Sequence, residues 1–261
     1  MTHATLTLEW HDRVAIVRLN DPTSLNALTL EMIDSFAHAL DDVEDRARAM
    51  VLTGTGRAFC SGANLVGGLG EPVEPTLFDA GAVLEARINP LMARLRDLAV
   101  PWITAVNGAA AGAGASLALA GDMIVASESA FFLQAFARIG LVPDAGSTHM
   151  LVRTLGRPRA MELMLLADRL PAQTALQWGL INQVVADDAL EATALACAMR
   201  LAQGAGSLRV IRKLAWQAVD ASWDELLLAE RASQRDAGRT GDYAEGVAAF
   251  LGKRAPAFRG T

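Results

Sequence analysis

The sequence predicts an α/β fold, and three observations support that prediction. Strand-like and helix-like segments alternate along the chain as far as Val185. From Pro158 onward the pattern is otherwise almost entirely helical. The chain has 261 residues, of which 52% are hydrophobic and only 5% aromatic, so a large core of thin side chains is available. Alternation of this kind favours sheets covered by helices, but it does not distinguish a doubly wound sheet from a spiral of ββα turns.

The first elements follow from hydrophobic periodicity. Thr5–Trp10 alternates with period two, and after a turn at His11 and Asp12 the apolar run Val14–Leu19 predicts the second strand of a hairpin. Leu30–Asp45 has the apolar spacing of an amphipathic helix, and Thr29 before it is a favourable N-cap.

Later elements are expected at short apolar runs and at longer periodic ones. Buried strands are expected at Ala49–Thr53, Trp102–Val106, Asp122–Ala126, Ala130–Leu133 and Ile181–Val185. Helices are expected from about Ala80 to Leu98 and, after a turn at Leu141–Thr148, to about Leu155.

Composition and charge exclude several classes of protein. The net charge is −6 and no Lys/Arg-rich block is present, so we expect no nucleic-acid partner. The apolar runs are short and punctuated by glycine, so we expect no membrane span. The first residues lack a signal-peptide pattern, so we expect no signal peptide. Cys60 and Cys197 lie far apart and are expected as free thiols in the cytoplasm, and the four histidines show no metal-ligand spacing. Arg209, Arg212 and Lys213 are expected to form a solvated basic patch on a helix.

The stretch Asn107–Ala120 is built almost entirely from glycine and alanine. It follows a buried strand and continues into an Ala/Leu run that predicts a packed helix. Small side chains allow another group to approach the backbone, and free N–H groups at a helix N-terminus can stabilise an anion or a developing oxyanion. The alternative is a small-residue helix that simply packs in the core.

Several segments together are similar to a known family. They are Leu19–Pro22, Leu25–Leu28, Arg57–Leu65, Asn107–Leu117, Gly121–Asp122, Gly140–Thr148 and Ala175–Val184. In their order and spacing they resemble the crotonase superfamily, the enoyl-CoA hydratase/isomerase family, over essentially the whole chain.

The resemblance implies a crotonase-like spiral of ββα units over residues 1–200 and a C-terminal helical trimerisation region over residues 201–261. It implies a homotrimer or a hexamer made of two trimers. The implied substrate is an acyl-CoA thioester, with no cofactor beyond the CoA that the substrate carries.

The resemblance also implies an oxyanion hole. Its two donors are the backbone N–H groups of Ala63 and Ala113, both expected in small-residue turns at helix starts. The implied substrate-binding positions around them are Ser61, Gly62, Asn64, Leu65, Gly112, Gly114, Ser116, Phe136 and Leu141.

Three side chains decide which reaction such a site performs. Hydratases of the family use two glutamates, and here those positions hold Ser116 and Phe136. Asp144 stands where isomerases of the family carry their acid/base residue. From the residues alone Asp144 is more simply an N-cap of the following helix, whereas the resemblance favours a catalytic carboxylate in an apolar pocket.

The implied activity is isomerisation of a 3-enoyl-CoA to a 2-enoyl-CoA with Asp144 as the acid/base, most like the ring-epoxide isomerase branch of phenylacetate catabolism. One alternative is a hydratase-like enzyme or another crotonase lyase. An aryl-CoA dehalogenase of this family would need a pocket histidine, between the two oxyanion turns, to activate water. No histidine lies between Asn64 and Asn107, so that activity is disfavoured. The alternative from another class is a non-catalytic paralogue that binds acyl-CoA.

Overall fold

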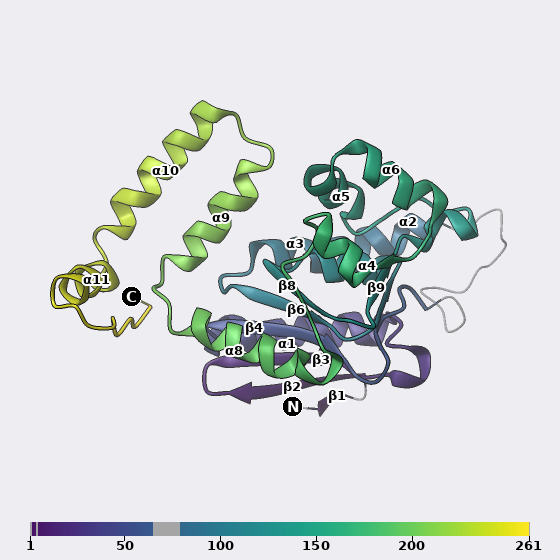
Figure 1. Ribbon diagram of the computed structural model, residues 1–261, viewed down its shortest axis with the longest axis horizontal. Helices are drawn as coiled ribbons and strands as arrows, with labels where there is room; N and C mark the ends of the chain where they lie inside the picture. Colours follow the sequence, from purple (N-terminus) through teal and green to yellow (C-terminus); the bar gives the residue numbers. More distant parts are fainter. Residues whose placement is uncertain (1, 4, 65–78, 261) are drawn as a thin grey trace.

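The computed structural model describes residues 2–3, 5–64 and 79–260, and in it two sheets are covered by helices (Figure 1). The larger sheet has the strand order β1-β2-β3-β4-β6-β8-β11. β1, β2 and β3 pair antiparallel, whereas β3, β4, β6, β8 and β11 run parallel. Its strands are β1 (Thr2–His3), β2 (Leu6–His11), β3 (Val14–Leu19), β4 (Ala49–Gly54), β6 (Trp102–Val106), β8 (Met123–Ser127) and β11 (Gln183–Val185).

The smaller sheet has the order β10-β9-β7-β5. β5, β7 and β9 run parallel and β10 pairs antiparallel with β9. Its strands are β5 (Ala58–Cys60), β7 (Ala109–Ala111), β9 (Phe131–Leu133) and β10 (Leu170–Pro171).

The chain visits the two sheets in turn. Each unit places one strand in the larger sheet, the next strand in the smaller sheet, and then a helical segment: β4 and β5, then β6 and β7, then β8 and β9. The helical segments are α2 (Ala80–Val83), η2 (Leu84–Ile88) and α3 (Asn89–Asp97), then α4 (Ala113–Leu119), then η3 (Ala135–Ile139) and α5 (Ser147–Leu155). This arrangement confirms the ββα spiral and excludes a doubly wound sheet.

Periodic segments folded as expected. The hairpin β2–β3 and the strand β6 are present, and α1 (Leu30–Arg46) begins where Thr29 Oγ1 accepts a hydrogen bond from the Met32 N–H at 3.1 Å. The helix expected over Ala80–Leu98 is also present. It contains a π-helical stretch, in which the Asn89 N–H bonds to the Leu84 carbonyl next to Pro90.

The larger sheet is buried on both faces. The side chains of Met50 and Leu52 belong to a core shared with α1, α3 and α4, whereas those of Ala49 and Val51 belong to a second core with α8 (Leu190–Ala202). Burial on both faces explains why these strands read as continuous apolar runs.

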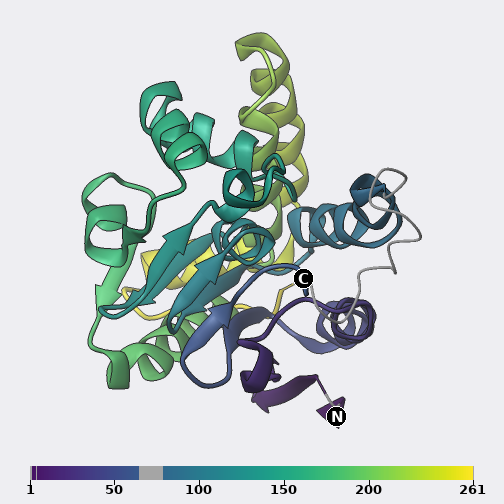
Figure 2. The same ribbon diagram turned by 90° about the vertical axis from the view of Figure 1, so that its right-hand side faces the viewer.

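The last helices extend away from the two sheets. α9 (Leu208–Ala218) and α10 (Trp223–Ala237) form a hairpin beside the body, with α11 (Gly241–Leu251) beyond it (Figures 1 and 2). Several large apolar side chains there face solvent, including Trp223 at 75% and Phe250 at 83% exposure. The trimerisation role of residues 201–261 stays a prediction. No helix in the described part of the chain is long and apolar enough to span a membrane.

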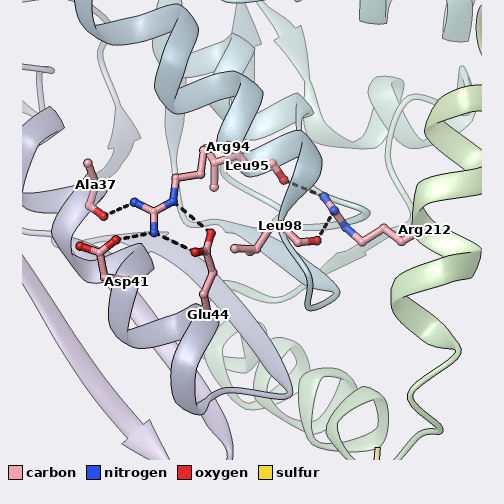
Figure 3. Close-up of polar contacts among 7 residues, drawn as sticks. All are labelled: Ala37, Asp41, Glu44, Arg94, Leu95, Leu98 and Arg212. Carbon is pink, nitrogen blue, oxygen red and sulfur yellow. Dashed lines mark hydrogen bonds and ion pairs between the residues drawn. The ribbon is translucent and has the colours of Figure 1, made fainter. Parts of the chain in front are cut away.

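The basic patch expected on α9 was wrong for Arg212. Arg212 is buried, its Nε lies 2.5 Å from Asp122 Oδ2, and its other nitrogens donate to the carbonyls of Leu95, Arg96 and Leu98. It therefore holds the C-terminal end of α3, as Figure 3 shows for Leu95 and Leu98. Local periodicity could not reveal this role, because the partners of Arg212 lie 90 or more residues away in the sequence.

A second arginine fastens α3 from the other side. Arg94 donates to the Ala37 carbonyl at 2.7 Å and pairs with Asp41 and Glu44 of α1 (Figure 3). The helix α3 is thus tied to α1 at one side and to α9 at the other.

Replacing Arg212 with methionine should destabilise the fold strongly. The change leaves the Asp122 carboxylate without its cation and three carbonyls, two of them in buried hydrogen bonds, without their donor. We expect a loss of about 3–5 kcal/mol in the free energy of urea unfolding. Arg209→Met, at an exposed position on the same helix, is the control and should change that free energy by less than about 0.5 kcal/mol. Equal losses in the two variants would show that Arg212 does not act as a buried tie.

Candidate functional site

Two small-residue segments meet at close range in the structure. A Cβ placed on Gly114, in the first turn of α4, would lie 2.3 Å from the Cys60 carbonyl oxygen. A Cβ placed on Gly62 would lie 2.8 Å from the Ala111 carbonyl oxygen and 3.5 Å from the Ala113 nitrogen. Gly62 also has φ +96°, which L side chains rarely adopt. Only glycine at these two positions lets the Ser61–Asn64 segment lie against the start of α4.

The Ala113 N–H lies at a helix N-terminus, as predicted. Ala113 is the first residue of α4, and the first N–H groups of a helix have no intrahelical partner. The preceding Gly112 N–H donates to the Leu133 carbonyl at 2.9 Å, but no backbone acceptor in the described chain pairs with the Ala113 N–H. This donor is available to an oxyanion.

The local structure at Ala63 differs from the one predicted. Ala63 was expected at a helix start, but it forms a parallel β-bridge with Leu28. The Leu28 N–H donates to Gly62 O at 2.7 Å, and the Asn64 N–H donates to Leu28 O at 3.0 Å. In such a bridge the N–H of the middle residue faces away from the partner strand. The Ala63 N–H is therefore directed away from Leu28.

Two asparagine amides, one buried and one half-buried, support these segments, and their role was not predicted. Asn26 is fully buried, and its Nδ2 donates to the carbonyls of Thr55, Ala58 and Phe59. Asn107 Nδ2 donates to the Gly56 carbonyl at 2.8 Å and to that of Ala58 at 3.1 Å. The two asparagines hold the turn that leads into β5. For Asn107 the available signal was its position before Gly108 in a turn, where asparagine amides often bond backbone groups.

Asp144 lies between η3 and α5, and its carboxyl group is desolvated. Its Oδ1 is buried and has no hydrogen-bond partner among the described residues. Burial raises the pKa of the Asp144 carboxyl to about 6. The N-cap hypothesis is wrong, because α5 begins at Ser147 with Gly146 as its N-cap and without a side-chain cap.

Ser116 and Phe136, where the resemblance implies the glutamates of hydratases, lie beside these groups. Ser116 is fully buried, and its Oγ donates to the Asp144 carbonyl at 3.0 Å. Phe136 is 5% exposed, and its Cζ lies 3.9 Å from a Cβ placed on Gly112. The structure thus brings Asp144, Ser116 and Phe136 to the first turn of α4.

Other predicted contact positions lie around this turn. Leu141 is 43% exposed, and its N–H donates to the Phe136 carbonyl. Ser61 is half-buried, and its Oγ donates to the Ser24 carbonyl at 3.0 Å. Asn64 is also half-buried, and Leu65 lies outside the described residues. The substrate-binding role of all these positions stays a prediction.

No metal cluster accompanies the site. Within residues 2–3, 5–64 and 79–260, no group of three or more His, Cys, Asp or Glu side chains could hold a metal ion.

Comparison with known proteins identifies the class. The family model described as enoyl-CoA hydratase/isomerase matches residues 9–261. The chain is 46% identical over 250 residues to the 1,2-epoxyphenylacetyl-CoA isomerase of Escherichia coli, with 95% of both chains covered. It is 40% identical to a probable enoyl-CoA hydratase of Rhodobacter capsulatus over the full length of both. An enoyl-CoA hydratase structure from Bacillus anthracis matches with TM-score 0.90 and 28% identity, covering 98% of this chain and 100% of that one.

The chain therefore belongs to the enoyl-CoA hydratase/isomerase family, and it has the crotonase fold of that family. It is an enzyme of a family that acts on acyl-CoA thioesters. The names of its relatives include both isomerases and hydratases, so membership alone leaves the reaction open.

A side chain at Gly62 should damage the site by steric conflict. Gly62→Ala forces a Cβ against the Ala111 carbonyl, so we expect a loss of about 2 kcal/mol or more in unfolding free energy and at least 10-fold weaker acyl-CoA binding. Gly179→Ala is the control, since Gly179 also has a positive φ but nothing within 4 Å of a Cβ. It should lose about 1–2 kcal/mol from backbone strain, with acyl-CoA affinity unchanged. Equal affinities for the two variants would argue against the close contact.

The buried carboxyl of Asp144 should make stability depend on pH. Its pKa is about 6 in the folded chain against an ordinary 3.8, so the neutral form stabilises the fold below pH 4 and that contribution is lost as pH rises through 6. Asp144→Asn cannot ionise. Its unfolding temperature relative to wild type should therefore increase between pH 4 and pH 7. Asp168→Asn, at an exposed position, serves as the control and should show a flat difference. A flat difference for Asp144→Asn as well would contradict a desolvated carboxyl.

Proposed function

We propose that the chain is an acyl-CoA isomerase that converts a 3-enoyl-CoA to the 2-enoyl-CoA, with Asp144 as the single acid/base. One observation carries the proposal. The main chain of Asp144 is bonded to Ser116 in the first turn of α4, and Ser116 and Phe136 stand at the two positions where the resemblance implies glutamates in hydratases, which supports Asp144 as the carboxyl that acts here.

The proposed reaction needs one proton carrier and one oxyanion site. The thioester oxygen accepts hydrogen bonds from the N–H groups of Ala63 and Ala113. The Asp144 carboxylate removes a proton from C2, and the electron pair delocalises onto the thioester oxygen as a dienolate. The same proton returns from Asp144 to C4, which leaves the double bond between C2 and C3. Loss of one such oxyanion donor typically costs about 3 kcal/mol of transition-state stabilisation.

The pKa of Asp144 suits this task. A carboxyl with a pKa of about 6 is mostly ionised at pH 7–8 and yet is a stronger base than an ordinary aspartate. A purely structural aspartate is normally hydrogen-bonded or paired. The buried, unpartnered Oδ1 of Asp144 therefore supports a catalytic role.

A hydratase reaction is the second candidate, favoured by the names of several relatives. It requires groups that orient and activate water. Ser116 Oγ is bonded to a backbone carbonyl, and Phe136 cannot transfer a proton. A non-catalytic paralogue is disfavoured, because an inactive chain would gain nothing from a buried, unpartnered carboxyl.

The substrate and setting are part of the proposal. The relative named 1,2-epoxyphenylacetyl-CoA isomerase supports ring-derived acyl groups alongside linear ones. The exposed apolar side chains of α9–α11 support a homotrimer or a hexamer. We propose a cytoplasmic enzyme that needs no cofactor beyond the CoA of its substrate.

Asp144→Asn should abolish isomerisation while preserving binding. With 3-hexenoyl-CoA we expect kcat to fall by about 100- to 10,000-fold, the range attributed to general acid–base catalysis, and the acyl-CoA dissociation constant to change little. In the wild type, kcat/KM should rise with pH through about 6 and then level off, because the base must be ionised. Asp168→Asn should behave as wild type. Retained isomerisation by Asp144→Asn, or formation of 3-hydroxyacyl-CoA as the main product, would refute the proposal.

A further inference from the structure

We propose that Ser116 is a positioning residue, which holds the base Asp144 at a set distance from the oxyanion turn. The inference rests on the proposed function and deepens it. It assigns a role to the side chain that stands where a hydratase would carry a glutamate.

The hydroxyl of Ser116 connects two parts of the site. Its Oγ lies 3.0 Å from the Asp144 carbonyl oxygen and 3.4 Å from the Gly112 carbonyl oxygen. A hydroxyl carries one proton, so the shorter contact to Asp144 is the main hydrogen bond. Ser116 lies three residues after Ala113 in α4. One short helix therefore presents the oxyanion N–H and also holds the backbone of the base.

The backbone around Asp144 is tied on its other side as well. The Asp144 carbonyl accepts a second hydrogen bond from the Ser147 N–H at 3.0 Å. Ser147 Oγ donates in turn to Gln134 Oε1 at 2.9 Å, and both side chains are buried. Between these ties Ala145 and Gly146 both have positive φ angles, which makes the turn tight. Helix α4, through Ser116, and helix α5, through Ser147, thus both donate to the Asp144 carbonyl oxygen.

The carboxyl group of Asp144 has no comparable tie. Its Oδ1 makes no hydrogen bond within the described chain, so its position follows from the backbone that carries it. A hydrogen-bond donor on the carboxylate would favour its charged form, lower its pKa and make it a weaker base toward C2. Hydrogen bonds to the main chain of Asp144 fix the position of its carboxyl group and leave the carboxyl oxygens free to accept the proton.

Loss of the Ser116 hydroxyl should affect the chemical step more than binding. A misplacement of about 1 Å can cost up to about 100-fold in rate. For Ser116→Ala we expect kcat with 3-hexenoyl-CoA, and the rate of C2-proton exchange in D2O, to fall about 10- to 100-fold, with KM within about threefold of wild type. Ser116→Cys, which keeps a weak donor, should fall between Ala and wild type. Ser116→Thr retains the hydroxyl and should recover most of the rate.

The matched control is Thr104→Val. Thr104 is also fully buried, and its Oγ1 donates to the Ala118 carbonyl of the same helix at 2.8 Å, away from Asp144. It should lower the melting temperature as Ser116→Ala does, yet keep the wild-type kcat. The positioning role is overturned if Ser116→Ala and Ser116→Cys keep the wild-type kcat, if they lose no more than Thr104→Val does, or if Ser116→Thr is as slow as Ser116→Ala.

Asp144→Asn, assayed in parallel, separates the two proposals. If Asp144→Asn is inactive and the Ser116 variants are unaffected, only the positioning role fails. If Asp144→Asn retains full activity, the proposed function fails first.

Discussion

The contact between Gly114 and the Cys60 carbonyl brings the two halves of the site together. A single Cβ at Gly114 would come within 2.3 Å of that oxygen, so the first turn of α4 can lie on β5 only because no side chain intervenes. The pairing of β5 with β7 and the approach of Gly62 to Ala113 depend on the same closeness. The backbone N–H groups that could hold an oxyanion are therefore placed by main-chain packing. Substitution of functional side chains would leave that part of the site intact.

Side chains then decide what the shared scaffold does. In the proposed function, Ser116 and Phe136 leave the site without carboxylates that would activate water, and Asp144 supplies one half-buried carboxyl whose Oδ1 is unpartnered. Its burial raises its pKa to about 6, which costs the folded state stability at neutral pH but gives a better base. A local cost of this kind is typical of functional sites, where residues are kept for chemistry rather than for stability.

Much of this molecule was predictable from its sequence. The strands β3 and β6 and the helix α1 carry strong periodicity, and the glycine–alanine stretch around Ala113 indicated a backbone anion site. The short strands β5 and β7 were not predicted, because three residues each, Ala-Phe-Cys and Ala-Ala-Ala, are too few to show a strand period and form only by pairing in the smaller sheet. The buried role of Arg212 depends on partners 90 and more residues away, which no local pattern contains. The hydrogen bond from Ser116 to Asp144 spans 28 residues and was invisible for the same reason.

The most direct measurement follows a single deuteron. A 3-enoyl-CoA carrying deuterium at C2 is incubated with the enzyme in H2O, and the product of the first turnovers is analysed by mass spectrometry and NMR. If one buried carboxyl takes and returns the proton, the 2-enoyl-CoA should carry deuterium at C4, and no 3-hydroxyacyl-CoA should form. A product hydrated at C3 would contradict Asp144 as the single acid/base, as would a first-turnover product without deuterium at C4 when the recovered substrate has lost no deuterium to solvent.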